Sequence, residues 1–503
     1  MNYVQGSGKS LGVGTALFLV MIALAVAGGA IPAQAQNYSI LYDFTGAPSD
    51  AGAPAGLVAQ GVDGNLYGYS TSGGQYGNGT IYQMSPSGGP PNVLYSFPTD
   101  DECGLGLTLG TDGNFYGACA GGGSNGSGYV FQFTLGATQP VVLYNFCKSG
   151  PPCSDGNAPS SRPIEGTPGN FYGTTLTGGA NKTGTVYQIT STGAFTSLYS
   201  FPNDPNVSYP DGPLLLASDG NLYGTTQAST SDYPSCPPCG GAVYEISTDG
   251  KFFNVLHTFT GTPSDGATPT RGVIQGTDGD LYGTTVYGGF SQGLNYGTIF
   301  QLTLTPTGEV KTFTIPRPAF DDFSFTTSDY GHPRGLDQSS TGNFYGDANG
   351  CSIKKGCYDN GSLFEITPAG TFSWAHEFGG PPNDGADPDS TLSHTNGTLY
   401  GVTRGGGTDD LGVFYSLNFN APEFCRPQIT FGHQGDPIGI LGQNFSSSSV
   451  VKFGGTQAEI VTQTGTFITA KIPAGAKTGL VEVTTPGFNQ PALYSLQAFR
   501  VLP

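Results

Sequence analysis

Aspartate recurs where the chain enters each copy of a repeated apolar pattern, usually beside Gly and shortly before Pro. These residues are Asp50, Asp155, Asp211, Asp265, Asp329 and Asp384. A ring of such carboxylates could bind cations or the hydroxyl groups of a sugar. An Asp in a turn can instead accept hydrogen bonds from its own backbone and begin the next strand. Because a catalytic site usually breaks repeat symmetry, recurrence favours the turn role, and ligand binding by these six residues is the alternative.

Cleavage of a glycosidic bond needs two carboxylates, which could come from distant copies of the pattern. The acidic residues are too many to single out an acid and a base. The chain contains no HExxH sequence, and its Asp-Gly turns lack the spacing of a Ca²⁺ loop. His257 and His376 replace Tyr in a repeated strand, which indicates packing, and the other three His have no obvious catalytic partner. The sequence therefore predicts no catalytic residue, metal or cofactor.

Nine Cys, in a chain with an export signal, indicate disulfides. Neighbours in sequence give the pairs Cys103 with Cys119, Cys147 with Cys153, Cys236 with Cys239, and Cys351 with Cys357. Cys425 is left over. The CPPC sequence could be a redox motif, but no βαβ pattern surrounds it, so a loop staple is favoured. The four pairs fall in loops that we expect on one face of the fold, which is typical of a binding surface on a rigid scaffold.

The elements that would position these residues come from a repeat. A [LF]YG sequence recurs with its Tyr at 67, 116, 172, 223, 282, 345 and 400, at intervals of 49 to 63 residues. Periods of this length indicate a propeller or a solenoid. Each copy contains four strand-like pieces with Asp-Gly turns, which is the make-up of a propeller blade. We expect Gly224 and its equivalents to let neighbouring backbones approach closely.

The order of the pieces predicts closure. The repeat region opens on a fourth-type piece, SILYDF, and ends on a third-type piece, GVFYSL. The N-terminal strand can therefore complete the last blade and leave no open edge. The fold class predicted is all-β, a seven-bladed β-propeller at residues 36–420 followed by an immunoglobulin-like β-sandwich at residues 425–503.

Composition narrows the class of protein. The 503 residues carry a formal charge of −19, so a nucleic-acid partner is excluded. Residues 1–35 have a weakly basic start, an apolar core and an Ala-Gln-Ala cleavage site, which predicts a removed signal peptide. An uncleaved membrane anchor is the alternative. We expect no membrane span in the mature chain and a secreted or cell-surface location.

The pattern DGNLYGTT, followed by GTVYQIT and LYSF, resembles the repeat of the GloVer family of secreted bacterial proteins. The resemblance covers about residues 38–420 and implies an exported, propeller-forming protein without an established catalytic activity. The sixth and seventh copies depart from it, with VKTF and AHEF in place of LYSF. The segments ILGQNF, VVKFGG, AKIPAG and GLVEVTT resemble the IPT/TIG domain, which implies a binding or spacing role.

These observations predict an exported, non-enzymatic binding or cell-envelope protein. Its ligand face would be formed by the long disulfide-bearing loops, with glycans or cell-surface proteins as partners. The alternative is a carbohydrate-active enzyme, a glycosidase or lyase, that uses carboxylates in the propeller channel. A third possibility is a structural spacer, expected if neither face has a cleft.

Overall fold

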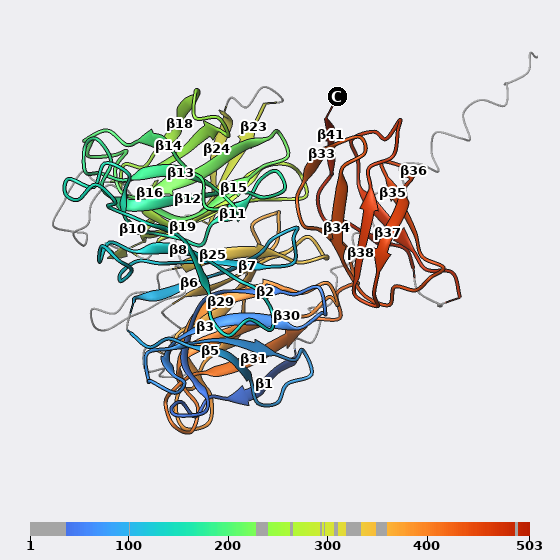
Figure 1. Cartoon of the computed structure of the whole chain (residues 1–503), viewed down its shortest axis with the longest axis horizontal. Coiled ribbons are helices and arrows are strands. Elements are labelled where there is room, and N and C mark those ends of the chain that lie inside the picture. The colour runs from blue at the N-terminus through green and yellow to red at the C-terminus, as the bar shows by residue number, and fades with distance from the viewer. Residues whose placement is uncertain are drawn as a thin grey trace, which may run out of the picture. The chain divides into compact units, whose positions relative to one another are not determined.

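The computed structural model describes residues 37–99, 101–227, 240–261, 265–291, 294–295, 297–305, 310–317, 333–348, 360–487 and 491–502. All regular elements in these ranges are β-strands, apart from turns, which confirms the predicted all-β class (Figure 1). The predicted signal peptide lies outside the described residues.

Most strands form antiparallel sheets whose strands pair in chain order. The first sheet contains β2 (Ala51–Gln60), β3 (Leu66–Gly73), β4 (Thr80–Met84) and β5 (Asn92–Ser96). The next contains β6 (Cys103–Leu109), β7 (Phe115–Cys119), β8 (Tyr129–Phe133) and β9 (Val141–Asn145). It is followed by β10 (Asn157–Pro159), β11 (Ile164–Glu165), β12 (Asn170–Thr177), β13 (Thr185–Thr190) and β14 (Phe195–Ser200).

The later sheets repeat this order. One contains β15 (Pro210–Leu216), β16 (Asn221–Thr226), β17 (Ala242–Ser247) and β18 (Phe253–Thr258). Another contains β19 (Gly266–Gln275), β20 (Leu281–Gly288), β23 (Thr298–Leu304) and β24 (Val310–Arg317), with the short hairpin β21 (Phe290–Ser291) and β22 (Leu294–Asn295) beside it in sequence. The next contains β25 (Pro333–Gln338), β26 (Phe344–Ala348), β27 (Ser362–Ile366) and β28 (Phe372–Glu377).

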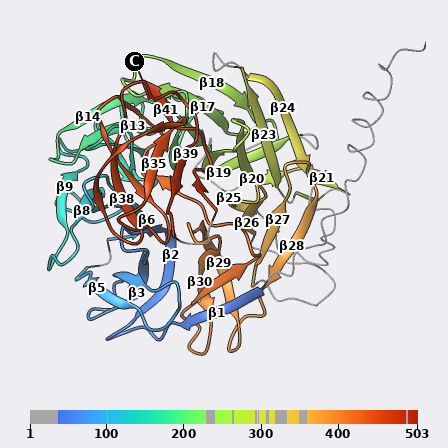
Figure 2. The same ribbon diagram turned by 90° about the vertical axis from the view of Figure 1, so that its right-hand side faces the viewer.

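The last sheet of this region closes the series. It contains β29 (Gly385–Ser393), β30 (Leu399–Gly406) and β31 (Val413–Asn418), and its fourth strand is β1 (Asn37–Asp43) from the other end of the region. The antiparallel pairing of β1 with β31 confirms the predicted closure by the N-terminal strand. Consecutive sheets contact each other, and β29 contacts β2, so the last sheet packs against the first (Figure 2).

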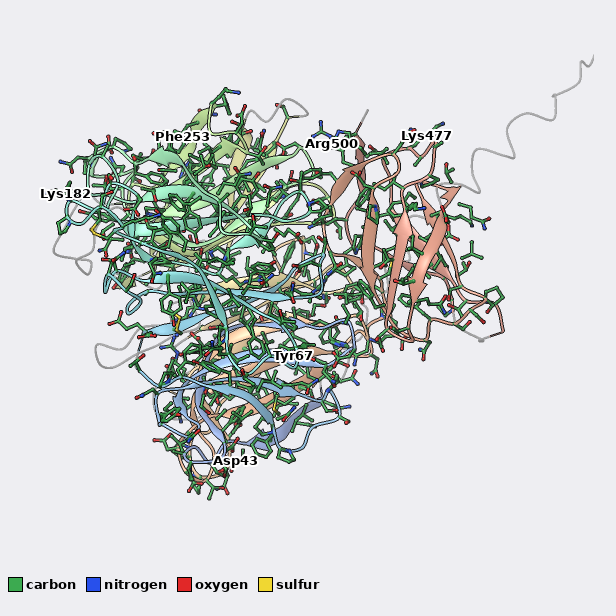
Figure 3. The ribbon with its side chains drawn as sticks, viewed as in Figure 1. Asp43, Tyr67, Lys182, Phe253, Lys477 and Arg500 are labelled. Carbon is green, nitrogen blue, oxygen red and sulfur yellow. A yellow bond between two sulfur atoms is a disulfide. The ribbon has the colours of Figure 1, made fainter. Side chains whose placement is uncertain are left out.

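The repeated DGN-LYG sequence has a structural reason in these sheets. The hydroxyl of Tyr67 on β3 donates to the Asp63 carboxylate in the preceding turn at 2.9 Å, and Gln83 on β4 donates to the Tyr67 hydroxyl at 2.8 Å. The Tyr67 ring, labelled in Figure 3, also packs on Phe115 of the next sheet, with centroids 4.3 Å apart. One Tyr therefore joins its turn, its own sheet and its neighbour. The same hydroxyl-to-turn bond occurs at Tyr116, Tyr223 and Tyr282.

The Gly of the LYG sequence makes room for a ring, and not for a neighbouring backbone as we expected. Gly224 lies opposite Tyr244 in the pairing of β16 with β17. A Cβ atom at Gly224 would overlap the Tyr244 hydroxyl group. The third strand thus lays its aromatic ring over the Gly of the second strand within one sheet. The same cross-strand pairing joins Gly68 to Tyr82, Gly117 to Phe131, Gly173 to Tyr187, Gly283 to Phe300, and Gly346 to Phe364.

Replacing this glycine should destabilise the chain. Gly224→Ala would push a methyl group into the fully buried Tyr244 ring, and overpacking of this kind costs about 1–3 kcal/mol. Gly465→Ala is the matched control, because a Cβ atom there meets no atom within 4 Å. Urea unfolding of both variants measures the difference. Equal stability of the two variants would contradict the role assigned to the glycine.

The C-terminal residues form two further four-stranded sheets around one core. The first contains β32 (Arg426–Pro427), β34 (Pro437–Leu441), β38 (Phe467–Lys471) and β37 (Glu459–Gln463). The second contains β36 (Thr456–Gln457), β35 (Val450–Phe453), β39 (Val481–Thr484) and β40 (Leu493–Tyr494). β33 (Phe431–His433) pairs in parallel with β41 (Arg500–Leu502). Buried residues of both sheets, such as Ile440 and Val451, belong to one hydrophobic cluster. We call residues 425–502 the C-terminal module.

Candidate binding cavity

A cavity of about 580 Å³ lies among the first strands of the repeated sheets. Residues of β2, β15, β19, β25 and β29 line it, and residues of the C-terminal module line one part of its wall. The wall is mixed, because it contains leucines such as Leu57, Leu105 and Leu214 together with charged and hydroxyl-bearing side chains. A concave site with apolar walls and a few convergent polar groups is the usual form of a ligand pocket.

The C-terminal module contacts turns that join a first strand to a second strand in several of the sheets. Gln428 Nε2 donates to the Gly110 carbonyl at 3.0 Å, and Thr466 Oγ1 donates to the Val62 carbonyl at 2.7 Å. The Arg500 guanidinium, labelled in Figure 3, donates to the Asp219 carbonyl. We call this the module end of the cavity. The loops that enter each sheet lie at the opposite end, which we call the loop end.

Bulges in the first strands position the side chains at the loop end. In β19 the register with β20 shifts between Pro269 and Val273, and Arg271 lies within this bulge with a φ of 66°. In β29 the register shifts between Pro388 and Ser390, which places Asp389 at the bulge. A bulge bends its strand and re-aims a side chain. The bulge that follows Pro269 in β19 therefore presents Arg271 to the cavity, and the bulge that follows Pro388 in β29 presents Asp389.

These two side chains form the centre of a charged cluster. The Asp389 side chain has no exposed surface and forms an ion pair with Arg271. Arg404 Nη2 lies 3.2 Å from Asp389 Oδ2, and the Gly56 N–H donates to the same oxygen at 2.7 Å. Burial acts to raise the pKa of Asp389, but Arg271, Arg404 and the Gly56 N–H outweigh it and lower the pKa below its ordinary value. Asp389 is therefore ionised at neutral pH.

Asp347, near the end of β26, has a pKa that is shifted in the opposite direction from that of Asp389. Its side chain lines the cavity, is buried, and has an Oδ2 atom without a hydrogen-bond partner. Burial raises the pKa of Asp347 to about 7, although Arg271 and Arg334 act to lower it. Burial also raises the pKa of Asp211, which lines the same cavity. The loop end thus combines an ionised carboxylate with a carboxyl group that titrates near neutral pH.

The six Asp residues predicted from the sequence do not form one ring around this cavity. Of the five that the structure describes, only Asp211 lines it. Asp50 accepts hydrogen bonds from the Thr45 and Ala51 N–H groups, at 2.8 and 2.7 Å, and from the Tyr42 hydroxyl. Asp265 and Asp384 bind turn N–H groups in the same way, and each also contacts the His that replaces Tyr, His257 or His376. Asp329 lies outside the described residues.

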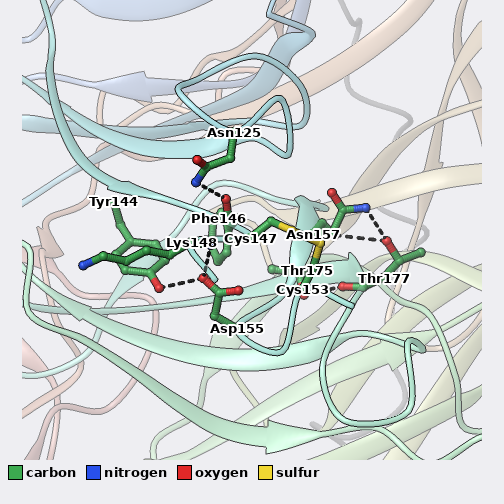
Figure 4. Close-up of a disulfide and its surroundings, with 10 residues drawn as sticks. All are labelled: Asn125, Tyr144, Phe146, Cys147, Lys148, Cys153, Asp155, Asn157, Thr175 and Thr177. Carbon is green, nitrogen blue, oxygen red and sulfur yellow. Dashed lines mark hydrogen bonds between the residues drawn. A yellow bond between two sulfur atoms is a disulfide. The ribbon is translucent and has the colours of Figure 1, made fainter. Parts of the chain in front are cut away.

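The fifth of these residues, Asp155, lies beside a disulfide (Figure 4). It accepts hydrogen bonds from the Tyr144 hydroxyl at 2.7 Å and the Lys148 N–H at 3.1 Å. These bonds close the loop that leads into the next sheet. The hydrogen bonds of Asp50, Asp155, Asp265 and Asp384 therefore correspond to the turn role that the sequence favours.

The structure contains disulfides between Cys103 and Cys119 and between Cys147 and Cys153, which are two of the four predicted pairs. Both lie at the loop end. Cys236, Cys239, Cys351 and Cys357 lie outside the described residues. Cys425 is a buried free thiol at the start of the C-terminal module, and burial raises its pKa.

Sequence reasoning missed most of the charged cluster, although two signals for it were present. The position after the shared Pro is Ala55, Ser160 or Thr270 in some copies but Arg334 or Asp389 in others. Asp347, in FYGDA, stands where other copies have Thr, Ala, Tyr or Val. The chain has only seven Arg, and four of them line this cavity: Arg162, Arg271, Arg404 and Arg426. Departures from the repeat therefore mark the site better than the repeated Asp does.

Neither a metal site nor a membrane-spanning helix is found among the described residues. No group of three or more His, Cys, Asp or Glu residues among them could hold a metal ion. No helix within those ranges has the length and apolar character needed to cross a membrane.

Comparison with known families identifies the family to which the repeat belongs. The model of the Gloeobacter/Verrucomicrobia repeat matches residues 30–151 and 104–315, which together span more than half of the chain. The chain belongs to this repeat family. The model of the IPT/TIG domain matches residues 426–499, which agrees with the resemblance seen in the sequence. Tandem repeats of this family followed by a TIG domain fit a binding or cell-envelope protein.

Comparison with curated proteins gave no match. Among solved structures, a fungal alcohol oxidase in complex with copper is 14% identical, with a TM-score of 0.49, and covers 93% of this chain and 99% of its own. A gluconolactonase from Xanthomonas campestris is 12% identical, with a TM-score of 0.37, and covers 76% of this chain and 95% of its own. Because both TM-scores lie below 0.5, these likenesses assign neither an activity nor a ligand to the repeat protein.

Proposed function

We propose that this chain is an exported binding protein of the cell envelope, built as a seven-bladed β-propeller with an immunoglobulin-like C-terminal module. Its ligand, a glycan, would enter between the disulfide-bearing loops and bind in the central cavity. The sheets that pack in sequence and close through β1 support the propeller. The two C-terminal sheets around one core support the immunoglobulin-like module. The disulfides are compatible with export.

The distribution of charge carries this proposal. In a chain of net charge −19, four of seven Arg line one cavity, and a fifth, Arg334, pairs with Asp387 at 3.3 Å beside it. Guanidinium and carboxylate groups in such numbers offer many hydrogen-bond donors and acceptors in fixed positions. A sugar presents matching hydroxyl groups, and apolar side chains such as Leu105 provide contacts for its C–H faces.

A glycan-array screen of the mature protein, with a turnover assay on every hit, tests this proposal. Leu105→Trp should fill part of the cavity and lower the affinity for any hit at least tenfold. Tyr76→Ala is the control, since Tyr76 is an exposed aromatic in the loop between β3 and β4 at the loop end. Binding that survives Leu105→Trp and is lost in Tyr76→Ala would place the ligand on the loops and overturn the cavity site.

One observation favours a second function, a carbohydrate-active enzyme. Asp347, with a pKa of about 7, and Asp389, with a lowered pKa, line the same cavity. Two carboxyl groups whose surroundings push their pKa values apart are the arrangement that acid–base catalysis uses. If the chain is an enzyme, a hit will be turned over, and Asp347→Asn will abolish turnover while binding remains. Binding without turnover in the wild type would exclude this function for that ligand.

A further inference from the structure

Two arginines, Arg162 and Arg426, line the module end of the cavity without a carboxylate partner among the described residues. Arg162 follows β10, and Arg426 begins the C-terminal module in β32. Both line the cavity. Among the described residues, neither has a carboxylate oxygen within the 4.0 Å of an ion pair. Arg162 Nη1 donates to the Leu107 carbonyl at 3.0 Å, and Arg426 Nη2 donates to the Ser393 carbonyl at 2.6 Å.

The hydrogen bonds of Arg162 are incomplete, although its Nη1 also donates to the Thr108 hydroxyl at 2.9 Å. The Nε–H of Arg162 is buried and has no partner. The hydroxyl of Thr430, which lines the same end and comes from the C-terminal module, is also buried without a partner. Buried polar groups in proteins are almost always hydrogen-bonded, so two unpartnered groups that line one cavity indicate a place for a ligand's polar atoms.

The charges at this end do not balance. The charge of the Asp337 carboxylate acts on both arginines. Its two oxygens already accept the N–H groups of Gln338, at 2.9 Å, and Ser393. Burial lowers the pKa of Arg162 to about 10, and the charge of Arg426 adds to this effect. Two cations therefore repel each other in a partly dry site with one acid to offset them. An isolated buried charge is costly unless an opposite charge joins it.

We propose that the module end of the cavity binds the carboxylate or sulfate group of an acidic sugar, held between Arg162 of the propeller and Arg426 and Thr430 of the C-terminal module. One excess positive charge matches a monoanion, and both groups are monoanions with several acceptor oxygens. Guanidinium groups bind such oxyanions through strong, charge-assisted hydrogen bonds. The proposal rests on the glycan-binding function above and explains why the module lies against the cavity: it supplies part of the site.

The test compares matched sugars on the full mature chain. Calorimetric titration would use trigalacturonic acid, its fully methyl-esterified form, and a sulfated galactose trisaccharide. We expect an acidic sugar to bind at least tenfold more tightly than the neutral ester, and Arg162→Gln and Arg426→Gln each to remove that preference. Arg500→Gln is the matched control, because Arg500 contacts a turn outside the cavity wall. Preference for the carboxylate or for the sulfate sugar distinguishes the two anions.

A measurement without variants keeps the proposal testable if the arginine variants fold poorly. Galacturonate should raise the melting temperature of the wild-type chain, whereas galactose at the same concentration should raise it less. If neutral and acidic sugars bind equally and Leu105→Trp weakens both, the anion site is wrong and the binding function stands. If no glycan on the array or in the titration binds in a manner sensitive to Leu105→Trp, the proposed function fails and the anion site fails with it.

Discussion

Asp347→Asn should stabilise the folded chain by about 4 kcal/mol at pH 8 and leave its stability almost unchanged at pH 4. Burial raises the pKa of Asp347 from 3.8 to about 7. Since the folded pKa lies above the unfolded one, folding favours the protonated form. The favourable contribution of Asp347 to the free energy of unfolding is therefore fully present below pH 4 and is lost as the pH rises through 7. Asn keeps the shape of the side chain and removes the titration.

Urea unfolding of the wild type and Asp347→Asn at pH 4, 6 and 8 measures this effect. Asp409→Asn is the charge-matched control, because Asp409 is exposed and should leave the pH dependence of the wild type in place. Stability curves that run parallel for the wild type and Asp347→Asn would show that this carboxyl group does not titrate near neutral pH. That result would also remove the support for an acid–base pair in the cavity.

Arg271→Ala should destabilise the chain by about 3–5 kcal/mol at neutral pH. The side chain of Asp389 is fully buried, and Arg271 is the largest influence that keeps it ionised. Removing one partner of a buried ion pair leaves an uncompensated charge, which costs several kcal/mol. Arg404 and the Gly56 N–H still contact Asp389 in this variant, so we expect the loss of stability to lie near the lower end of that range.

Denaturant unfolding of Arg271→Ala beside Lys471→Ala tests this prediction. Lys471 pairs with Glu459 at 3.1 Å on the surface, where an ion pair contributes at most about 1 kcal/mol. Adding Asp389→Leu to an Arg271→Leu variant should recover part of the lost stability, because the buried charge is then removed. A cost for Arg271→Ala as small as that of the control would mean that the cluster does not depend on this pair.

The fold was largely predictable because it repeats. The [LF]YG sequence predicts sheets of four strands, and the permuted start predicts the pairing of β1 with β31. These sheets depend on short-range contacts that recur from copy to copy, such as the hydrogen bond from the Tyr67 hydroxyl to the Asp63 carboxylate. The role of Gly224 was predicted incorrectly, because its close neighbour is a side chain on another strand that sequence spacing does not locate.

The cavity itself was not predicted from the sequence, because the repetition that reveals the fold does not mark it. Ligand binding by the repeated Asp residues was the alternative considered, and four of them bind the N–H groups of turns, which is the role that the sequence favours. The cavity residues occur singly, and Arg271, Asp347 and Asp389 come from three different sheets. Bulges after the shared Pro residues and the position of the C-terminal module bring them and Arg426 to one cavity. Neither a bulge register nor the docking of a domain can be read from residue spacing.

Hydrogen–deuterium exchange of the full chain, with and without the strongest glycan ligand, tests the central claim most directly. The claim is that the ligand binds in the cavity lined by the first strands of the repeated sheets and by the C-terminal module. The account predicts slower exchange in the first strands β19, β25 and β29 and in residues 424–430, with little change in the outer strands β5, β9 and β14. Protection confined to the outer strands or to the loop at residues 74–79 would contradict it.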